Sequence, residues 1–363
     1  MMQVYNIEII TQDGETVHFE CGTDEDVITA GIRQDVILMS SCREGGCATC
    51  KALCTDGEYE LVKCTVQALP PEEEEEGFVL LCRTFPRSNL TLEVPYTADR
   101  ISDSTVERDF FAEVVSITPI ASNVMQLKMR RLHSDAEGGA SGVTFEPGQF
   151  FDIQIPGTEH WRSFSPASLP NPDGTLEFLI RILPYGIFSN YLGDGAHPGQ
   201  TVRVRGPSGS FYIRENGLRP RYFVAGGTGL APIVAMVRQM SDRGDPHETR
   251  LYFGVNKDED VFYFQELAAL AEGMPNLTAQ ICILHAGPDW KGVRSNPVEA
   301  LRLDLEASGG KPDLYLCGPP GMIDATYRTC IALGIPEGNI CTEKFLPSGS
   351  TSAEGEKAPE MSQ

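Results

Sequence analysis

The sequence lacks several features that define whole classes of protein. It has no run of about 18 consecutive apolar residues, which excludes a membrane-spanning helix. The opening string M-M-Q-V-Y-N-I-E-I-I has neither a basic region nor a small-residue cleavage site, so no secretory signal is expected. Basic residues are scarce, since 29 Lys and Arg accompany 51 Asp and Glu and give a net charge of −22. This charge argues against nucleic acid and anionic membrane surfaces as partners.

Disulfides are not expected either, although the chain contains 11 cysteines. A disulfide framework is typical of small secreted proteins, whereas 363 residues are enough for two to three domains, each with its own core. Seven cysteines lie scattered in apolar or loop contexts and are predicted to be reduced thiols, which indicates the cytoplasm. They are Cys21, Cys54, Cys64, Cys282, Cys317, Cys330 and Cys341.

The other four cysteines form a metal-binding pattern. Cys42, Cys47 and Cys50 have the spacing C-x4-C-x2-C, and Cys82 follows after 31 intervening residues. This is the plant-type [2Fe–2S] ferredoxin pattern, in which four thiolates hold two irons. The alternative is a zinc site or a group of unrelated buried thiols. Zinc ligands usually come as two short pairs of similar size, whereas here one loop carries three sulfurs. The pattern therefore predicts one-electron transfer.

Negative charge is concentrated near this motif. Residues 1–98 hold 18 acidic and 6 basic side chains, and Glu72–Glu76 is an uninterrupted acidic run. Such a run can be a solvated loop that keeps the protein soluble. It can also steer the domain toward a basic patch on an electron acceptor. Both interpretations remain open from the sequence.

Hydrophobic periodicity divides the chain into three parts. In the first, two strands joined by Asp13-Gly14 precede a helix over Val27–Arg33, which a capping box of Thr23 and Asp26 would open. The second has short alternating strands with Gly and Pro between them, as in an antiparallel barrel. The third alternates buried-type strands with helices, as in an α/β nucleotide-binding domain.

The fold class is therefore α+β and α/β multidomain. The predicted divisions are a [2Fe–2S] domain at 1–98, a linker at 99–108, an FAD-binding β-barrel at 109–214, an NAD-binding α/β domain at 215–347 and a disordered tail at 348–363. The polar, Gly-rich segment His133–Gly142 is predicted to be a surface loop.

Two motifs in the predicted barrel indicate a flavin. In Arg162-Ser163-Phe164-Ser165, a fixed guanidinium can hold a pyrophosphate, an aromatic ring can lie on an isoalloxazine, and a hydroxyl can reach a flavin nitrogen. Downstream, Arg181 is followed by Gly186-Ile187-Phe188-Ser189, where a glycine would let the backbone approach a phosphate. Each motif alone could be an ordinary turn, but together they are moderately specific.

Two Gly-rich turns in the third part indicate a dinucleotide. Gly226-Gly227-Thr228-Gly229-Leu230-Ala231-Pro232 leaves a strand and opens a helix, which suits a pyrophosphate. Cys317-Gly318-Pro319-Pro320-Gly321-Met322 again lies at a strand end. A lone Gly-rich turn is often only a tight connection, and Cys317 could be an ordinary core thiol.

These motifs in this order resemble the ferredoxin–NAD(P)+ reductase superfamily. Longer strings, among them M-S-S-C-R-E-G-G-C-A-T-C-K-A-L-C, Q-A-L-P-P-E-E-E-E-E-G, Y-L-C-G-P-P-G-M-I-D-A and E-K-F-L-P-S-G, are more specific. They resemble the reductase components (component C) of soluble methane monooxygenases and their butane and propane relatives. The resemblance implies a β-grasp fold for the first domain. It also implies hydride transfer from NADH to FAD, and then single-electron transfer through the [2Fe–2S] cluster to a diiron hydroxylase docked on the acidic ferredoxin domain.

The resemblance also assigns roles residue by residue. Cys42, Cys47, Cys50 and Cys82 would hold the cluster. Arg162, Phe164, Ser165, Arg181, Gly186 and Ser189 would bind FAD, while Gly226, Gly227, Thr228, Gly229, Cys317, Gly318 and Pro319 would bind NADH. Ser165, Cys317 and Glu343 would lie along the hydride path, and Phe345 beside the rings. Two departures matter: Phe164 replaces the usual Tyr, and the chain continues past Phe345.

Cofactor preference and alternative functions follow from the remaining residues. Lys257 is followed by Asp258, Glu259 and Asp260, which suits a free ribose 2′-hydroxyl and hence NADH rather than NADPH.

Other candidate functions are a stand-alone flavin or ferric reductase and a binding module without redox activity. Among oxygenase partners, a Rieske-type dioxygenase is the second choice after a diiron hydroxylase, and a regulatory component is a further candidate partner.

Overall fold

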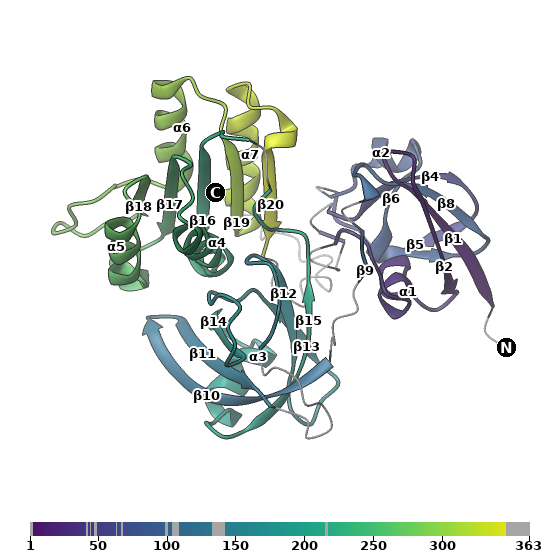
Figure 1. Ribbon diagram of the computed structural model, residues 1–363, viewed down its shortest axis with the longest axis horizontal. Helices are drawn as coiled ribbons and strands as arrows, with labels where there is room; N and C mark the ends of the chain where they lie inside the picture. Colours follow the sequence, from purple (N-terminus) through teal and green to yellow (C-terminus); the bar gives the residue numbers. More distant parts are fainter. Residues whose placement is uncertain are drawn as a thin grey trace, which may run out of the picture.

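The computed structural model shows three bodies in chain order (Figure 1). It describes residues 3–40, 43, 45–46, 49–62, 64–66, 68–98, 101–103, 109–132, 142–214 and 217–345. Cys42, Cys47, nearly all of the predicted loop at 133–142 and the predicted tail at 348–363 lie outside these residues. No helix in the described part of the chain is long and apolar enough to cross a membrane.

The first body is a small mixed sheet with one helix of seven residues, α1 (Val27–Arg33). Its strand order is β2-β1-β8-β4-β6, in which β1 is antiparallel to β2 and parallel to β8. The bounds are Val4–Ile10 (β1), Thr16–Gly22 (β2), Lys51–Asp56 (β4), Phe78–Leu80 (β6) and Leu90–Glu93 (β8). Two small sheets pair β3 (Val36–Ile37) with β9 (Ser102–Asp103) and β5 (Tyr59–Leu61) with β7 (Thr84–Pro86).

Two local predictions for this body need correction. The cap of α1 is Asp26 itself, whose carboxylate accepts from the Thr29 amide at 3.0 Å, so Thr23 does not open the helix. The acidic run is not a loop, because Pro71–Glu75 forms the short helix α2. Proline is favourable at the first helical position and glutamates are favourable in the first turn, so the sequence suits a helix start.

The second body is an antiparallel six-stranded barrel with the order β13-β12-β15-β10-β11-β14. A bridge between Pro166 and Phe178 joins its first and last strands. The bounds are Asp109–Ala121 (β10), Val124–Arg131 (β11), Phe150–Gln154 (β12), Trp161–Phe164 (β13), Thr175–Arg181 (β14) and Thr201–Ser208 (β15). Its interior is filled by buried aromatic and aliphatic side chains such as Phe151 and Phe178. One turn of helix, α3 (Ile187–Asn190), follows β14.

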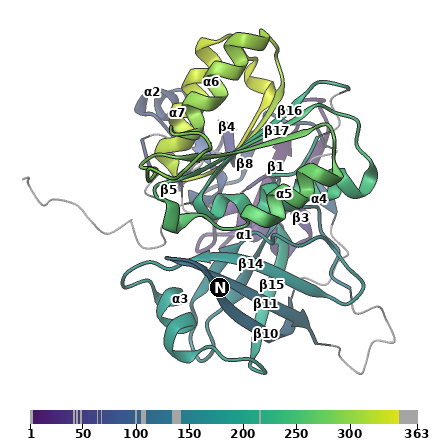
Figure 2. The ribbon, with the colours of Figure 1, turned by 90° about the vertical axis from the view of Figure 1, so that its left-hand side faces the viewer.

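The third body is a parallel sheet with the order β18-β17-β16-β19-β20. The strands are Arg221–Gly226 (β16), Thr249–Val255 (β17), Leu277–Ile283 (β18), Asp313–Gly318 (β19) and Ile340–Lys344 (β20), and the helices are Leu230–Arg243 (α4), Phe264–Gly273 (α5), Pro297–Ser308 (α6) and Pro320–Ala332 (α7). Phe223 and Ala225 pack with α4 and α5, whereas Tyr222 and Val224 pack with α6 and α7. The helices therefore cover both faces, as Figure 2 shows.

The strand order reverses between β16 and β19. Successive strands run outward from β16 to β18, and the chain then returns to place β19 on the other side of β16. In open α/β sheets, ligands bind beside such a switch point, at the carboxyl ends of the strands. In this sheet those ends are Gly226 and Gly318, the residues of the two Gly-rich turns.

Candidate flavin and nicotinamide site with a buried pair of thiols

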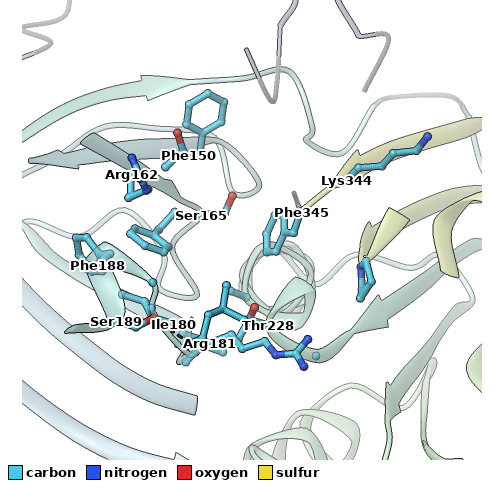
Figure 3. Close-up of a pocket in the computed structure, with 18 of the residues that line it drawn as sticks. Phe150, Arg162, Ser165, Ile180, Arg181, Phe188, Ser189, Thr228, Lys344 and Phe345 are labelled. Atoms are coloured by element: carbon cyan, nitrogen blue, oxygen red, sulfur yellow. Dashed lines mark hydrogen bonds between the residues drawn. The ribbon is translucent and has the colours of Figure 1, made fainter. Parts of the chain in front are cut away.

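A cavity of about 330 Å³ lies between the barrel and the carboxyl edge of the parallel sheet (Figure 3). The sequence-predicted residues that line it are Arg162, Phe164, Ser165, Arg181, Gly186, Ser189, Gly226, Gly227, Thr228, Pro319, Glu343 and Phe345. These residues come from five separate stretches of the chain. The fold thus brings nearly all of the predicted flavin and nicotinamide residues to one place.

The barrel wall of the cavity is formed by β13 and the residue after it. Pairing of β13 with β12 fixes the direction of its side chains, and Phe164 packs against Phe188 with ring centroids 4.7 Å apart. Ser165 is only 3% exposed, and its Oγ has no hydrogen-bond partner among the described residues. An unpaired buried hydroxyl is costly. A ligand with ring nitrogens or carbonyls in this cavity would give it a partner, so the site fits a flavin.

The turn after β14 forms a second part of this wall. Ser189 Oγ accepts a hydrogen bond from the Leu183 amide at 2.9 Å, which closes the turn around Gly186. A Cβ at Gly186 would lie 2.9 Å from Ser189 Oγ, so a side chain there would force the turn open. Arg181, at the end of β14, also borders the cavity. Two cationic side chains, Arg162 and Arg181, are thus available to an anionic ligand.

The sheet wall is formed by the turn after β16. Gly227 has φ +54°, a conformation that glycine adopts without strain, and with Thr228 it lines the cavity. Gly229 and Gly318 do not line it. A Cβ at Gly229 would lie 2.3 Å from the Cys317 carbonyl oxygen, and one at Gly318 would lie 2.9 Å from the Gly226 nitrogen. These two glycines instead allow close packing of the Gly-rich turns.

Cys317 also lies behind the cavity wall rather than on it. It pairs in register with Glu343 on β20, and the two residues are 0% and 4% exposed. Burial, reinforced by the negative charge of Glu343, raises the pKa of the Cys317 thiol well above its usual value. The thiol therefore stays protonated and is not a nucleophile. Glu343 itself borders the cavity, and the Phe345 amide donates to the Gly318 carbonyl at 2.9 Å, which anchors the end of β20.

Sequence analysis missed several cavity residues. Phe150 on β12, Ile187 and Phe188 on α3 and Lys344 on β20 all border the cavity. Phe188 is flanked by predicted residues, so its position in the G-I-F-S string was the available signal. Phe150 had no such signal, because it reaches the site only through pairing of β12 with β13 and β15.

The charged segment after β17 is held by contacts with the loop after β18 and with the turn between β10 and β11 of the barrel. Asp258 accepts from the Gly287 amide at 2.7 Å, and Asp260 accepts from Ser122 Oγ at 2.8 Å. The Lys257 ammonium lies 3.5 Å from Glu259. The segment thus remains acidic overall, which disfavours a ribose 2′-phosphate.

The first body contains a separate pair of sulfurs. Cys50 and Cys82 are 2% and 4% exposed, and their Sγ atoms lie 3.3 Å apart without a disulfide. The Leu81 amide donates to the Cys50 carbonyl at 3.0 Å and holds the two segments together. Two buried thiols this close suit ligation of one metal centre. The other seven cysteines form no disulfide either.

Family models match all three bodies. The model described as a 2Fe-2S iron-sulfur cluster binding domain covers residues 10–87, the oxidoreductase FAD-binding domain covers 112–213, and the oxidoreductase NAD-binding domain covers 223–328. The cofactors that these domains bind therefore agree with the three sites identified from the residues.

Similar proteins share the whole arrangement. Methane monooxygenase component C of Methylosinus trichosporium is 46% identical over 84% of this chain and 87% of its own length. The reductase component of propane 2-monooxygenase from Rhodococcus jostii is 33% identical over 91% of this chain and 89% of its own. Among solved structures, the Amycolatopsis cytochrome P450 reductase GcoB superposes with a TM-score of 0.78 at 27% identity, covering 93% of this chain and 98% of its own.

Proposed function

Because this chain belongs to the ferredoxin–NAD(P)+ reductase superfamily, among the reductase components of bacterial oxygenases, we propose that it serves a soluble methane monooxygenase. The protein is an NADH-dependent FAD and [2Fe–2S] oxidoreductase. The observation that carries the proposal is the 46% identity to a methane monooxygenase component over 84% of the chain. The relative that acts with a propane monooxygenase is less similar, at 33% identity. A Rieske-type dioxygenase partner remains the second alternative.

The cofactors and the protein have separate tasks. When bound, FAD accepts a hydride from NADH and the [2Fe–2S] cluster passes the electrons onward one at a time. In this proposal Arg162 holds the FAD pyrophosphate, Phe164 packs beside the flavin ring, and Ser165 donates its otherwise unpaired hydroxyl to the ring. Arg181, Gly186 and Ser189 complete the flavin seat.

The nicotinamide nucleotide would bind on the sheet side of the same cavity. The turn of Gly226, Gly227 and Thr228 would receive its pyrophosphate, with Pro319 on the neighbouring turn. Gly229 and Gly318 would contribute by letting the turns pack together, and Cys317 by forming a neutral floor behind Glu343. Phe345 borders the cavity at the end of β20 and would shield the reacting rings from water.

The cluster would be completed by Cys42 and Cys47 together with the buried pair Cys50 and Cys82. The domain limits proposed from the sequence, 1–98, 109–214 and 215–347, each enclose one family match. A protein of this kind, with reduced thiols, would work in the cytoplasm.

An oxygenase reductase needs a hydroxylase partner. We expect a diiron hydroxylase to dock on the acidic first domain, since α2 presents Glu72, Glu74 and Glu75 to solvent. Opposite charges across an interface mainly accelerate encounter and are screened by salt. A regulatory component of the same system is a second candidate partner.

Reconstitution tests this function. The purified protein, NADH and candidate methane, butane and propane hydroxylases are combined, and alkane oxidation is measured at rising salt. The proposal predicts turnover with the methane hydroxylase, and salt should slow hydroxylase reduction more than NADH oxidation by ferricyanide. Turnover only with another hydroxylase would overturn the methane assignment. Equal salt effects would remove the acidic docking face. Colourless protein, or protein whose colour NADH does not bleach, would indicate a binding module.

A further inference from the structure

Among the described residues of the cluster loop, Arg43 contacts the flavin barrel. This residue directly follows the predicted ligand Cys42 and has φ +53°, which is unusual for a residue other than glycine. Its guanidinium lies across the junction of β12 and β15. Nη2 lies 3.3 Å from Ser208 Oγ, Nη1 lies 3.6 Å from Asp152 Oδ2, and the group lies 5.8 Å from the centroid of the Phe150 ring.

The three barrel residues that Arg43 contacts lie next to the flavin cavity. Phe150 borders that cavity and pairs across the sheet with Ser208. Asp152 pairs with Ser163 on β13, whose Oγ donates to Asp152 Oδ1 at 2.5 Å. The Asp152 carboxylate therefore links the two parts. Its Oδ1 accepts from β13, the strand of Arg162 and Phe164, and its Oδ2 faces Arg43 of the cluster loop.

The environment of this contact makes it more than a surface ion pair. The side chains of Arg43 and Asp152 are only 28% and 12% exposed. Arg43 Nε is buried and has no hydrogen-bond partner among the described residues, whereas Nη1 and Nη2 face Asp152 and Ser208 of the barrel. Screening by solvent is reduced for such a pair. Arg43 is also one of only 6 basic residues among residues 1–98, which otherwise carry 18 acidic ones.

The backbone on both sides of the contact is closely packed. Ser40, three residues before Arg43, is 4% exposed. A Cβ at Gly209 would lie 2.8 Å from the Phe150 ring and 3.9 Å from the Ser40 carbonyl oxygen. The first domain therefore meets the barrel beside the end of β15, where Phe150 both borders the cavity and lies beside the Arg43 guanidinium.

We propose that Arg43 is a positioning residue that docks the cluster loop on the β12–β15 junction and thereby fixes the separation of flavin and cluster. The electron count is that of the reductase reaction. One hydride from NADH would bring two electrons to the flavin. The cluster would take them one at a time, passing the first to the hydroxylase before it takes the second, and the hydrogen would leave the flavin as a proton. Arg43 takes no part in the hydride step, because it contacts neither the sheet wall nor β20.

The first test separates the two steps in anaerobic stopped-flow experiments on the full protein with both cofactors. For Arg43→Gln we expect an unchanged rate of flavin reduction by NADH and at least a tenfold slower flavin-to-cluster transfer. Arg33→Gln is the matched control, because Arg33 pairs with Glu25 and donates to the Glu20 carbonyl, both within the first domain. The same slowing in Arg33→Gln, or none in Arg43→Gln, would overturn the proposal.

Two variants on the barrel side test whether the slower transfer comes from lost docking or from a change in the cluster itself. Asp152→Asn and Ser208→Ala leave the cluster loop unchanged in sequence, and each should slow flavin-to-cluster transfer while the cluster keeps its electron paramagnetic resonance spectrum. Combining Arg43→Gln with Asp152→Asn should slow transfer no further than the more severe single change, since both remove one interaction. Additive losses would mean that the two residues act independently.

A readout without turnover completes the design. Hydrogen–deuterium exchange of oxidised protein should show faster exchange in residues 150–154 and 206–209 in Arg43→Gln, and no change there in Arg33→Gln. Unchanged exchange in Arg43→Gln together with slowed electron transfer would assign the effect to the cluster itself and overturn the docking role. Failure of the proposed partner assignment would leave all of these measurements unaffected.

Discussion

The sulfur centre and the flavin–nicotinamide cavity are built in opposite ways. Three predicted cluster ligands lie within one short loop, and the fourth, Cys82, is brought to Cys50 by a backbone hydrogen bond. The cavity instead draws on β13, the α3 turn, two Gly-rich turns and β20, which span more than half of the chain. The first site depends on a few side chains of one chemical type, and the second depends on the packing of two domains.

This difference implies different responses to mutation. Loss of a single thiolate should abolish the sulfur centre and leave the cavity intact. The cavity should lose function gradually, through weaker cofactor binding or through loosening of the scaffold behind it. The following variants test that contrast.

The largest effect is expected for Cys50→Ala. The cluster loses a buried ligand, so hydroxylase reduction should fall to background while NADH oxidation by ferricyanide persists, because the flavin cavity lies in other domains. Absorbance, electron paramagnetic resonance and the two assays measure this. Cys54→Ala on β4 is the control, since its half-buried thiol donates to the Asp56 carbonyl and is not a predicted cluster ligand, so both activities should stay intact. Sustained hydroxylase reduction in Cys50→Ala would contradict the assignment.

A scaffold variant, Asp245→Asn, should affect stability rather than chemistry. Arg221 opens β16, its side chain is only 1% exposed, and it is ion-paired with Asp245, which also accepts from the His247 amide at 2.9 Å. Removing one partner of a buried pair typically costs about 3–5 kcal/mol. Calorimetry should show a lower unfolding temperature with cofactor affinity retained. Glu299→Gln, which removes an exposed pair with Arg302 in the same domain, should leave the unfolding temperature nearly unchanged.

The same carboxylate predicts a pH dependence. Burial alone would raise the pKa of Asp245, but hydrogen bonds from His247 and the charge of Arg221 bring it below its ordinary value. A carboxylate with a lowered folded-state pKa stabilises the fold above the unfolded value, and this contribution disappears as the pH falls below about 4. The wild type should therefore lose more stability than Asp245→Asn in that acidic range. Parallel acid titrations of the two proteins would contradict this prediction.

Arg162→Ala should weaken FAD binding by about 10- to 100-fold, since a charge-assisted hydrogen bond contributes about 1.5–3 kcal/mol. Flavin fluorescence titration of the apoprotein measures the affinity. Arg130→Ala is the matched control, because Arg130 is on β11 of the same barrel and pairs with Glu113 away from the cavity. Equal losses of affinity in the two variants would mean that general barrel charge, and not the position of Arg162, binds FAD.

The smallest effects should come from two neighbouring glycines. Gly229→Ala places a Cβ 2.3 Å from the Cys317 carbonyl, so α4 must shift, at a cost of about 1–3 kcal/mol. Gly227→Ala meets nothing within 4 Å and suffers only from φ +54°, at about 1 kcal/mol. Thermal unfolding and NADH affinity should both rank Gly229→Ala as the more damaging. The reverse order would show that backbone strain, and not packing of the turns, limits this site.

Sequence reasoning succeeded where a pattern is local. The cysteine spacing predicted the cluster domain that the family model matches, and the first part of the chain was predicted to form a helix over Val27–Arg33, the bounds observed for α1. The interpretation of the acidic run as a loop was wrong. Its charge suggested a loop, but Pro71 is favourable at the first position of a helix, and Pro71–Glu75 forms α2. It could not find Phe150 or the contact between Arg43 and Asp152, because strand pairing and domain packing alone bring these residues together.

The pairing of β9 with β3 has a consequence for how far the first domain can travel. Ser102 and Asp103 pair with Ile37 and Val36. The segment that connects this domain to the barrel therefore runs from Asp103 to Asp109, where β10 starts. At about 3.3–3.6 Å per residue, a connecting segment of that length spans roughly 20 Å when fully extended. Opening the two-residue ladder would lengthen this connecting segment back to Ala98, whose amide donates to the Asp13 carboxylate at 3.1 Å, and would nearly double its reach. The pairing of β3 with β9 thus limits how far the iron–sulfur domain can move from the barrel to reach an electron acceptor.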